Sequence, residues 1–161
     1  MSCWSLGEHD NMALWQLYGG VERSVAITST IGELVQAAFD WQQTVLIRKV
    51  RYIDHSKEPA MVIADYTDLL QFKHEAYRYE EEVRIIVPRQ ADDWERNPDG
   101  LRLPLGDLNA LVHSVIVSPE AKDWFYELVE DVTNRYGVSS PVRRSNITSL
   151  QRCPVTFRDR P

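Results

Sequence analysis

The sequence predicts an α+β fold, a single domain in which helices pack on one mixed β-sheet. Segments rich in β-branched residues alternate with segments whose apolar residues recur at helical spacing. The chain has 161 residues, of which 43% are hydrophobic and 26% charged, and this is enough to bury one core. No apolar run approaches the roughly 18 residues of a membrane-spanning helix, and the first residues do not resemble a secretory signal. We therefore expect a cytoplasmic protein that contacts no membrane.

In the first half of the chain, turn residues and helix caps separate short apolar segments. Gly19-Gly20 ends one predicted helix, and Ser29-Thr30 caps the next. The β-branched, alternating segment before Asp54 is the clearest strand. The expected elements are a strand over Ser2 to Ser5, a helix over Asn11 to Gly19, a buried strand over Ser24 to Thr28, a helix over Ile31 to Trp41, a strand over Thr44 to Ile53 and a loop over Asp54 to Pro59.

The second half shows the same alternation. Pro88 ends one strand, and Ser118-Pro119 is typical of a helix start. The helix that follows is expected to bury Trp124, Leu128 and Val132 and to end at Gly137. The expected elements are a helix over Tyr66 to Tyr79, a strand over Glu82 to Val87, a loop over Gln90 to Gly100, strands over Leu101 to Leu105 and Val112 to Val117, a helix over Glu120 to Tyr136, a strand over Pro141 to Ile147 and a loose tail over 151–161.

Charge, cysteine and histidine usage exclude several classes of function. The net charge of −6 argues against binding to nucleic acid over a broad surface, because such binding requires a basic surface. Cys3 and Cys153 have no partner at metal-ligand spacing, and we expect reduced thiols. The histidines are scattered, and we therefore expect no metal site; they are His9, His55, His74 and His113.

The densest chemistry lies between Lys73 and Arg84. If a strand begins by Glu80, then Glu80, Glu82 and Arg84 share one face at steps of roughly 7 Å. Because neighbouring carboxylates do not both ionise easily, we expect a raised pKa for one of them, which would make it a candidate general base, while Arg84 holds the other. The alternative interpretation is a solvated helix end whose ion pairs contribute little.

Two further groups of residues are open to a binding interpretation. Trp4 and Ser5, together with Trp15 and Tyr18, offer aromatic rings on which a base or a nicotinamide could stack, although aromatics at helical spacing also build cores. Ser29-Thr30 lies between a strand and a helix, where a phosphate or a ribose could bind, and a plain helix cap is the alternative.

Blocks spread over nearly the whole chain resemble DUF2971, a bacterial family of uncharacterised proteins. In the family pattern, Lys73, Glu80, Glu82 and Arg84 match the recurring Lys…Glu-x-Glu-x-Arg positions. The resemblance implies that 1–161 is one domain, a short form without the family's N-terminal extension; Ser24 stands where the family usually has Gly. The matching blocks are SCWS, MALWQLY, VAITST, VRYID, FKHEAYRYEEEVRIIV, IVSPEA and PVRRSNI.

A second resemblance implies a reaction. Glu80-x-Glu82 before an apolar strand, with Thr28-Ser29-Thr30 upstream, is similar to the Glu-x-Glu and Ser-Thr-Ser elements of ADP-ribosyltransferases. It implies that NAD is a substrate and not a bound cofactor, that Glu82 is catalytic, that Glu80 orients the acceptor and that Ser29 supports the pocket. The SCWS block lacks the Arg or His that those enzymes carry on their first strand.

Three functions therefore remain open. The first is an NAD-consuming transferase or glycohydrolase that acts on a small-molecule nucleotide or a protein target, and the resemblance associates it with toxins and phage defence. The second is a non-catalytic interaction or sensor module that uses the aromatics and the charges from Lys73 to Arg84. The third is a Mg²⁺-dependent nuclease-like site built from Glu80, Glu82 and Lys73.

Overall fold

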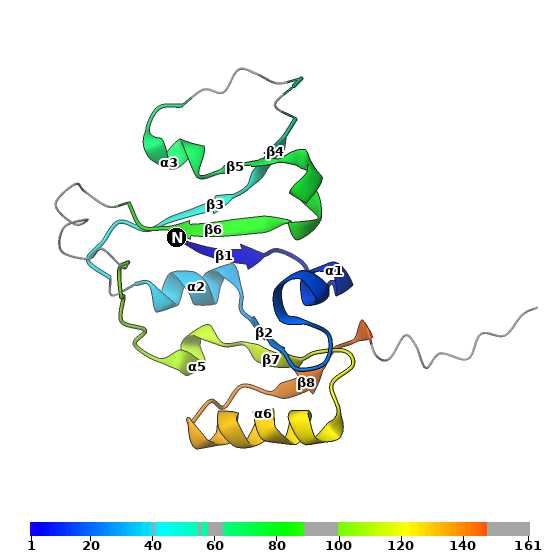
Figure 1. Cartoon of the computed structure of the whole chain (residues 1–161). Coiled ribbons are helices and arrows are strands. Elements are labelled where there is room, and N and C mark those ends of the chain that lie inside the picture. The colour runs from blue at the N-terminus through cyan, green and yellow to red at the C-terminus, as the bar shows by residue number, and fades with distance from the viewer. Residues whose placement is uncertain (40, 55, 58–62, 89–99, 148–161) are drawn as a thin grey trace, which may run out of the picture. The chain divides into compact units, whose positions relative to one another are not determined.

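The computed structural model describes residues 1–39, 41–54, 56–57, 63–88 and 100–147, and it confirms the α+β class (Figure 1). Its strands form three sheets where one was expected. The chain divides into two compact units, each made from two stretches of sequence. The first unit comprises Met1–Glu8 and Asp40–Pro104, and the second comprises His9–Phe39 and Leu105–Pro161. The expected loop over 90–100 and tail over 151–161 lie mostly or wholly outside the described residues.

The first unit contains a three-stranded antiparallel sheet and a two-stranded parallel one. Strands β1 (Ser2–Ser5) and β3 (Leu46–Lys49) flank β6 (Glu82–Ile86), and β4 (Arg51–Ile53) pairs with β5 (Phe72–His74). The strands β1 and β6 lie where the sequence predicts them. In β6, β-branched residues supply the strand, and alternation places Glu82 and Arg84 on the same face.

The strand expected over Thr44 to Ile53 is divided between the two sheets at Val50. The backbone N–H of Val50 donates to the carbonyl oxygen of Glu82 at 2.8 Å, whereas that of Arg51 donates to the carbonyl oxygen of Gln71 at 2.7 Å. Successive amides therefore bond to different strands. Alternation of side chains cannot reveal such a change of partner, because both halves have the same period.

The helix expected over Tyr66 to Tyr79 is wrong beyond its first turn. Helix α3 (Tyr66–Leu69) is capped by Asp65, and the chain then enters β5. A 3₁₀ helix, η2 (Glu75–Glu80), follows, and His74 accepts a hydrogen bond from the backbone N–H of Ala76 at its start. Pairing with β4 outweighs the helix propensity of this segment.

The second unit contains a mixed sheet in which β7 (Ser114–Val117) lies between β2 (Val25–Thr28) and β8 (Val142–Arg144). Strand β2 is antiparallel to β7, and β8 is parallel to it. All four residues of β7 are buried, as expected of a central strand. The expectation of a buried β2 is wrong, because Val25 and Ile27 on one of its faces are exposed. No strand forms over 101–105.

Helices of the second unit begin close to the predicted caps. Helix α1 (Met12–Leu14), capped by Asn11, continues as a π-helical turn, η1 (Trp15–Gly19), and α2 (Ile31–Ala37) begins after Thr30. A short α5 (Leu108–Leu111) precedes β7.

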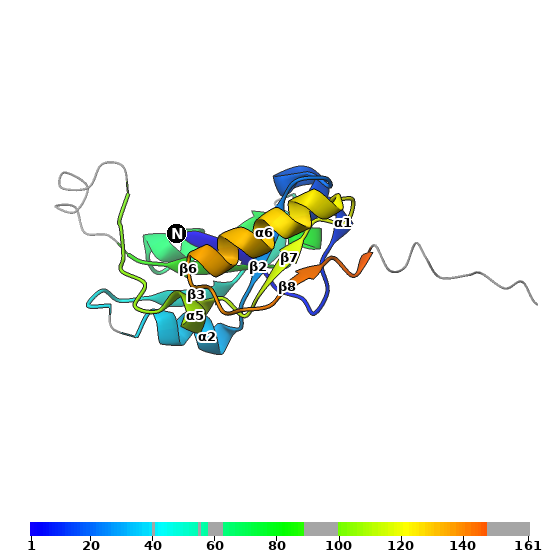
Figure 2. The ribbon, with the colours of Figure 1, turned by 90° about the horizontal axis from the view of Figure 1, so that it is seen from below.

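Helix α6 (Asp123–Arg135) departs from prediction in its start and its buried face. It is preceded by Lys122 and not by Ser118, and it lies along β7 and β8, as Figure 2 shows. Tyr126 donates to the carbonyl oxygen of Val142 at 3.0 Å, so this side of the helix faces the sheet. The three residues expected in the core are exposed: Trp124, Leu128 and Val132.

Candidate functional site: the charged cluster of the first unit

The turn between η2 and β6 brings two carboxylates close together. Glu80 ends η2, Glu82 opens β6, and Glu81 between them has φ 43°, in the left-handed region. Hydrogen bonds hold this turn at several points. The N–H of Leu6 donates to the carbonyl oxygen of Glu81 at 2.8 Å, and the Ser5 hydroxyl donates to that of Glu80 at 2.7 Å.

The backbone of Glu82 is fixed on both sides. Its N–H donates to the Tyr52 hydroxyl at 2.8 Å, and its carbonyl oxygen accepts the N–H of Val50 at 2.8 Å. Tyr52 belongs to β4, beside Lys73 on β5. The position of the Glu82 side chain is therefore set by two strands of the neighbouring sheet as well as by β6.

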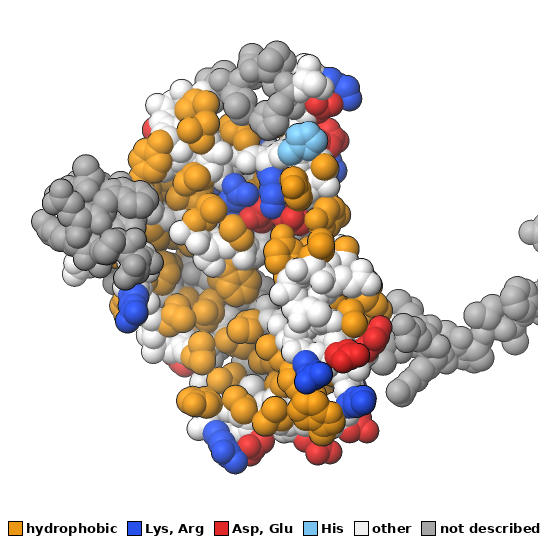
Figure 3. All heavy atoms as spheres, viewed as in Figure 1, with side chains coloured by type: hydrophobic (Ala, Val, Ile, Leu, Met, Phe, Trp, Pro, Cys, Tyr) orange, Lys and Arg blue, Asp and Glu red, His pale blue; other side chains and the backbone are white. Residues whose placement is uncertain are grey.

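Lys73, Glu80, Glu82 and Arg84 form one contact network, which we call the charged cluster. The Lys73 ammonium contacts the carboxylates of both Glu80 and Glu82, the latter at 3.3 Å. Arg84 donates two hydrogen bonds to the Glu82 carboxylate, from Nε to Oε1 at 3.1 Å and from Nη2 to Oε2 at 3.0 Å. The Nη1 of Arg84 donates to the carbonyl oxygen of Leu70. Figure 3 shows basic and acidic side chains gathered over β5 and β6.

The two carboxylates of the charged cluster are buried, unlike those of a solvated helix end, and the Lys73 side chain is 23% exposed. Glu80 and Glu82 are each 5% exposed. Two carboxylates and two cations balance in formal charge, which offsets part of the cost of removing each ion from water. Solvent does not screen these contacts as it screens a surface ion pair.

Crowding of the carboxylates does not raise the pKa of Glu82, which is the carboxylate that Arg84 holds. Burial alone would raise the pKa of Glu82, but hydrogen bonds from Arg84, Cys3 and Lys73 outweigh it and lower that pKa to about 2. Burial likewise opposes the charge of Lys73, yet its contacts with Glu80 and Glu82 raise the pKa of the ammonium group. The spacing placed one cation, Arg84, beside one carboxylate, but it did not predict that Lys73 contacts both carboxylates.

Cys3 and Tyr52 are members of the site that sequence reasoning missed. Cys3 lies opposite Arg84 in the β1–β6 register, and burial, followed by its hydrogen bond to Glu82, raises the pKa of its thiol. A thiol with a raised pKa stays protonated at neutral pH and donates to the carboxylate. Only the pairing of β1 with β6 reveals this contact, because Cys3 and Glu82 are far apart in sequence.

The other residues proposed for binding divide between the two units. In the first unit, Ser5 holds the η2–β6 turn, and Trp4 lies opposite Val83, on the face of the sheet away from Glu82.

The remaining four residues belong to the second unit. Thr30 caps α2 in a reciprocal pair with Glu33, and Ser29 donates to the same carboxylate at 3.4 Å. Trp15 is buried and donates to Asp10 at 3.0 Å, whereas Tyr18 is exposed.

Chemically, the charged cluster supplies an ionised carboxylate at Glu82. Among the residues that the structure describes, no group of three or more His, Cys, Asp and Glu side chains could hold a metal ion. The Lys73 ammonium lies between the two carboxylates, where a divalent ion would bind. Within the same described part of the chain, none of the helices is long and apolar enough to cross a bilayer.

Comparison with known proteins found no relative of this chain. The chain matches no model of a protein family, and searches of curated proteins and of solved structures gave no match either. The resemblance to DUF2971 and to ADP-ribosyltransferases therefore stays a prediction from the sequence blocks, and the geometry of the charged cluster carries the functional proposal.

Proposed function

We propose that this chain consumes NAD in the manner of an ADP-ribosyltransferase, as a transferase or a glycohydrolase. The observation that carries the proposal is the ionised Glu82 carboxylate, buried at the start of β6 between Lys73 and Arg84. A fixed negative charge in a site of low dielectric stabilises positive charge that develops on a substrate. The departure of nicotinamide from NAD develops such a charge on the ribose.

The reaction uses Glu82 as an electrostatic group. The bond between ribose C1′ and the nicotinamide nitrogen breaks, and the bonding electrons leave with nicotinamide. Water or a nucleophile of a target then bonds to C1′ and releases a proton to solvent. Glu80, two residues from Glu82, orients that acceptor, and Arg84 is a positioning residue for Glu82.

A ribose hydroxyl must replace an existing contact to reach Glu82. A carboxylate offers about four acceptor positions. Arg84 donates twice to Glu82, and Lys73 and the Cys3 thiol also contact it. A thiol is the weakest of these donors. We therefore expect the sugar hydroxyl to displace Cys3.

The test is nicotinamide release from NAD by the purified chain, compared with Glu82→Gln. We expect release by the unmodified chain and a loss of at least about 100-fold in the variant, as for removal of one preorganised electrostatic group. Glu127→Gln is the matched control, because Glu127 is exposed on α6. Undiminished release by a folded Glu82→Gln variant would refute the proposal.

A non-catalytic interaction module is the second candidate, favoured by the fact that internal partners occupy the Glu82 carboxylate. On that interpretation the charged cluster only stabilises the fold. It predicts no nicotinamide release by any form of the chain, and a lower melting temperature for Glu82→Gln without loss of binding to a cellular partner. The nuclease-like alternative is not proposed, because Lys73 lies where the metal would bind.

A further inference from the structure

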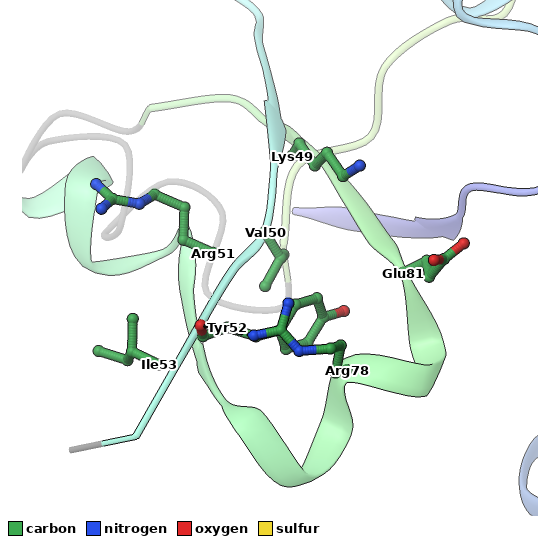
Figure 4. Close-up of a pocket in the computed structure, with 7 residues that line it drawn as sticks. All are labelled: Lys49, Val50, Arg51, Tyr52, Ile53, Arg78 and Glu81. Atoms are coloured by element: carbon green, nitrogen blue, oxygen red, sulfur yellow. Dashed lines mark hydrogen bonds between the residues drawn. The ribbon is translucent and has the colours of Figure 1, made fainter. Parts of the chain in front are cut away.

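A pocket of about 360 Å³ lies in the first unit, where β3 passes into β4 and η2 turns toward β6 (Figure 4). Two of its lining residues, Val50 and Ile53, are apolar and buried. The other lining residues are charged or aromatic. The lining residues are Lys49, Val50, Arg51, Tyr52, Ile53, Arg78 and Glu81.

The lining has an excess of positive charge. Three of the lining residues are cationic, Lys49, Arg51 and Arg78, and one carries a carboxylate, in a chain whose net charge is −6. The Arg51 side chain points away from Tyr52 and Arg78 (Figure 4). Among the described residues, neither Lys49 nor Arg51 forms an ion pair. The charge of Lys49 therefore remains available to an anion that enters the pocket.

Tyr52 and Arg78 form the centre of the site. The Arg78 guanidinium lies 5.6 Å from the centroid of the Tyr52 ring, and Figure 4 shows the two side chains next to each other. Arg78 also contacts Glu75 at 3.1 Å, but that pair is exposed and is weakened by salt. Arg51 adds charge from the neighbouring strand position, with its guanidinium 5.2 Å from the centroid of the Phe72 ring.

Backbone strain at the pocket is an independent observation. Among the described residues, Glu81 is the only one other than glycine with a positive φ. A non-glycine residue in the left-handed region costs roughly 1–2 kcal/mol and is concentrated at sites that bind ligands. Here the strained residue lines the pocket.

We propose that this pocket binds a small molecule through a phosphate group. Lys49 and Arg78 offer positive charge to a phosphate, and a guanidinium is the side chain best shaped to hold it. The Tyr52 ring offers a surface on which a flat group attached to that phosphate stacks. The inference does not depend on whether Glu82 turns over NAD.

The experiment measures binding to the full chain by titration calorimetry with three probes: inorganic pyrophosphate, AMP and adenosine. We expect pyrophosphate and AMP to bind and adenosine to bind at least roughly tenfold more weakly, since it lacks the phosphate. AMP binding tighter than that of pyrophosphate identifies a nucleotide site, and the reverse identifies a site for inorganic phosphates. Equal affinity for AMP and adenosine, or no binding of any probe, overturns the proposal.

The double variant K49Q/R78Q tests whether the anion binds in this pocket. Both side chains are on the surface, so the double variant is expected to fold, which a thermal melt checks. We expect AMP or pyrophosphate to bind roughly tenfold or more weakly. Arg135→Gln, which removes an exposed cation from α6, should leave binding unchanged. Equal affinities of K49Q/R78Q and the unmodified chain would place the anion elsewhere and refute the site.

Discussion

Replacing Lys73 with methionine removes the one cation that contacts both carboxylates of the charged cluster. Methionine retains most of the length and the apolar stem, so the change is chiefly one of charge. Glu80 then loses its contact with Lys73, and Glu82 retains Arg84. The substitution leaves two carboxylates, each 5% exposed, close together, and the remaining cation of the cluster, Arg84, contacts Glu82.

We expect Lys73→Met to lower the free energy of unfolding by about 3 kcal/mol at pH 7. Removing one partner of a buried ion pair costs about 3–5 kcal/mol, and the lower figure applies because the Lys73 side chain is 23% exposed and Glu82 keeps a counterion. The cost should shrink near pH 5, since the crowded carboxylates of the variant take up a proton more readily.

Lys57→Met is the matched control. Lys57 also contacts a carboxylate, that of Asp54 at 3.0 Å, but its side chain is 81% exposed. An exposed pair of this kind contributes up to about 1 kcal/mol. Urea unfolding of the three proteins at pH 5 and pH 7 measures the difference. If Lys73→Met costs no more than Lys57→Met, the charged cluster does not have the buried, coupled character described here.

Three further predictions concern the same unit. Folding lowers the pKa of Glu82 to about 2, so its ionised carboxylate stabilises the folded state above the unfolded pKa, and this stabilisation is lost as the pH falls toward 2. The stabilisation amounts to as much as about 3 kcal/mol. Glu82→Gln should therefore flatten the acid limb of a plot of urea midpoint against pH. Tyr52→Phe leaves the buried N–H of Glu82 without its acceptor, so the unfolding free energy should fall by about 1–3 kcal/mol, and an unchanged urea midpoint would contradict that bond. Glu81→Val should be less stable than Glu81→Gly by roughly 1–2 kcal/mol, because only glycine adopts φ 43° without strain; equal urea midpoints would argue against the left-handed turn.

Helix caps and runs of β-branched residues predicted the elements in which the local sequence preference matches the observed structure. Strand β6 was predictable because its β-branched residues run up to Pro88, and α2 was predictable because Thr30 and Glu33 form a capping pair. The exposed face of α6 was not predictable from spacing. Periodicity identifies an apolar stripe, but the sheet packs against the side of the helix that carries Tyr126.

The composition of the candidate site was predictable only in part. The sequence placed Glu82 and Arg84 on one face, because two-residue steps along a strand return to the same face. The placement of Glu80 in that strand is wrong, because Glu80 ends η2 and the left-handed turn at Glu81 separates it from β6. The contacts of Lys73, Tyr52 and Cys3 come from strand pairings that no local pattern encodes. Through these pairings Cys3 and Lys73 join Arg84 in lowering the pKa of Glu82, which makes Glu82 a fixed charge.

The most direct test of this account is the pKa of the Glu82 side-chain carboxyl, measured by ¹³C NMR titration and assigned with Glu82→Gln. We expect this carboxyl to titrate near pH 2, because Arg84 and Lys73 hold it ionised against the effect of burial. A carboxyl that titrates at or above about 4.3, the ordinary value for glutamate, would contradict both the structure of the charged cluster and the proposed electrostatic role.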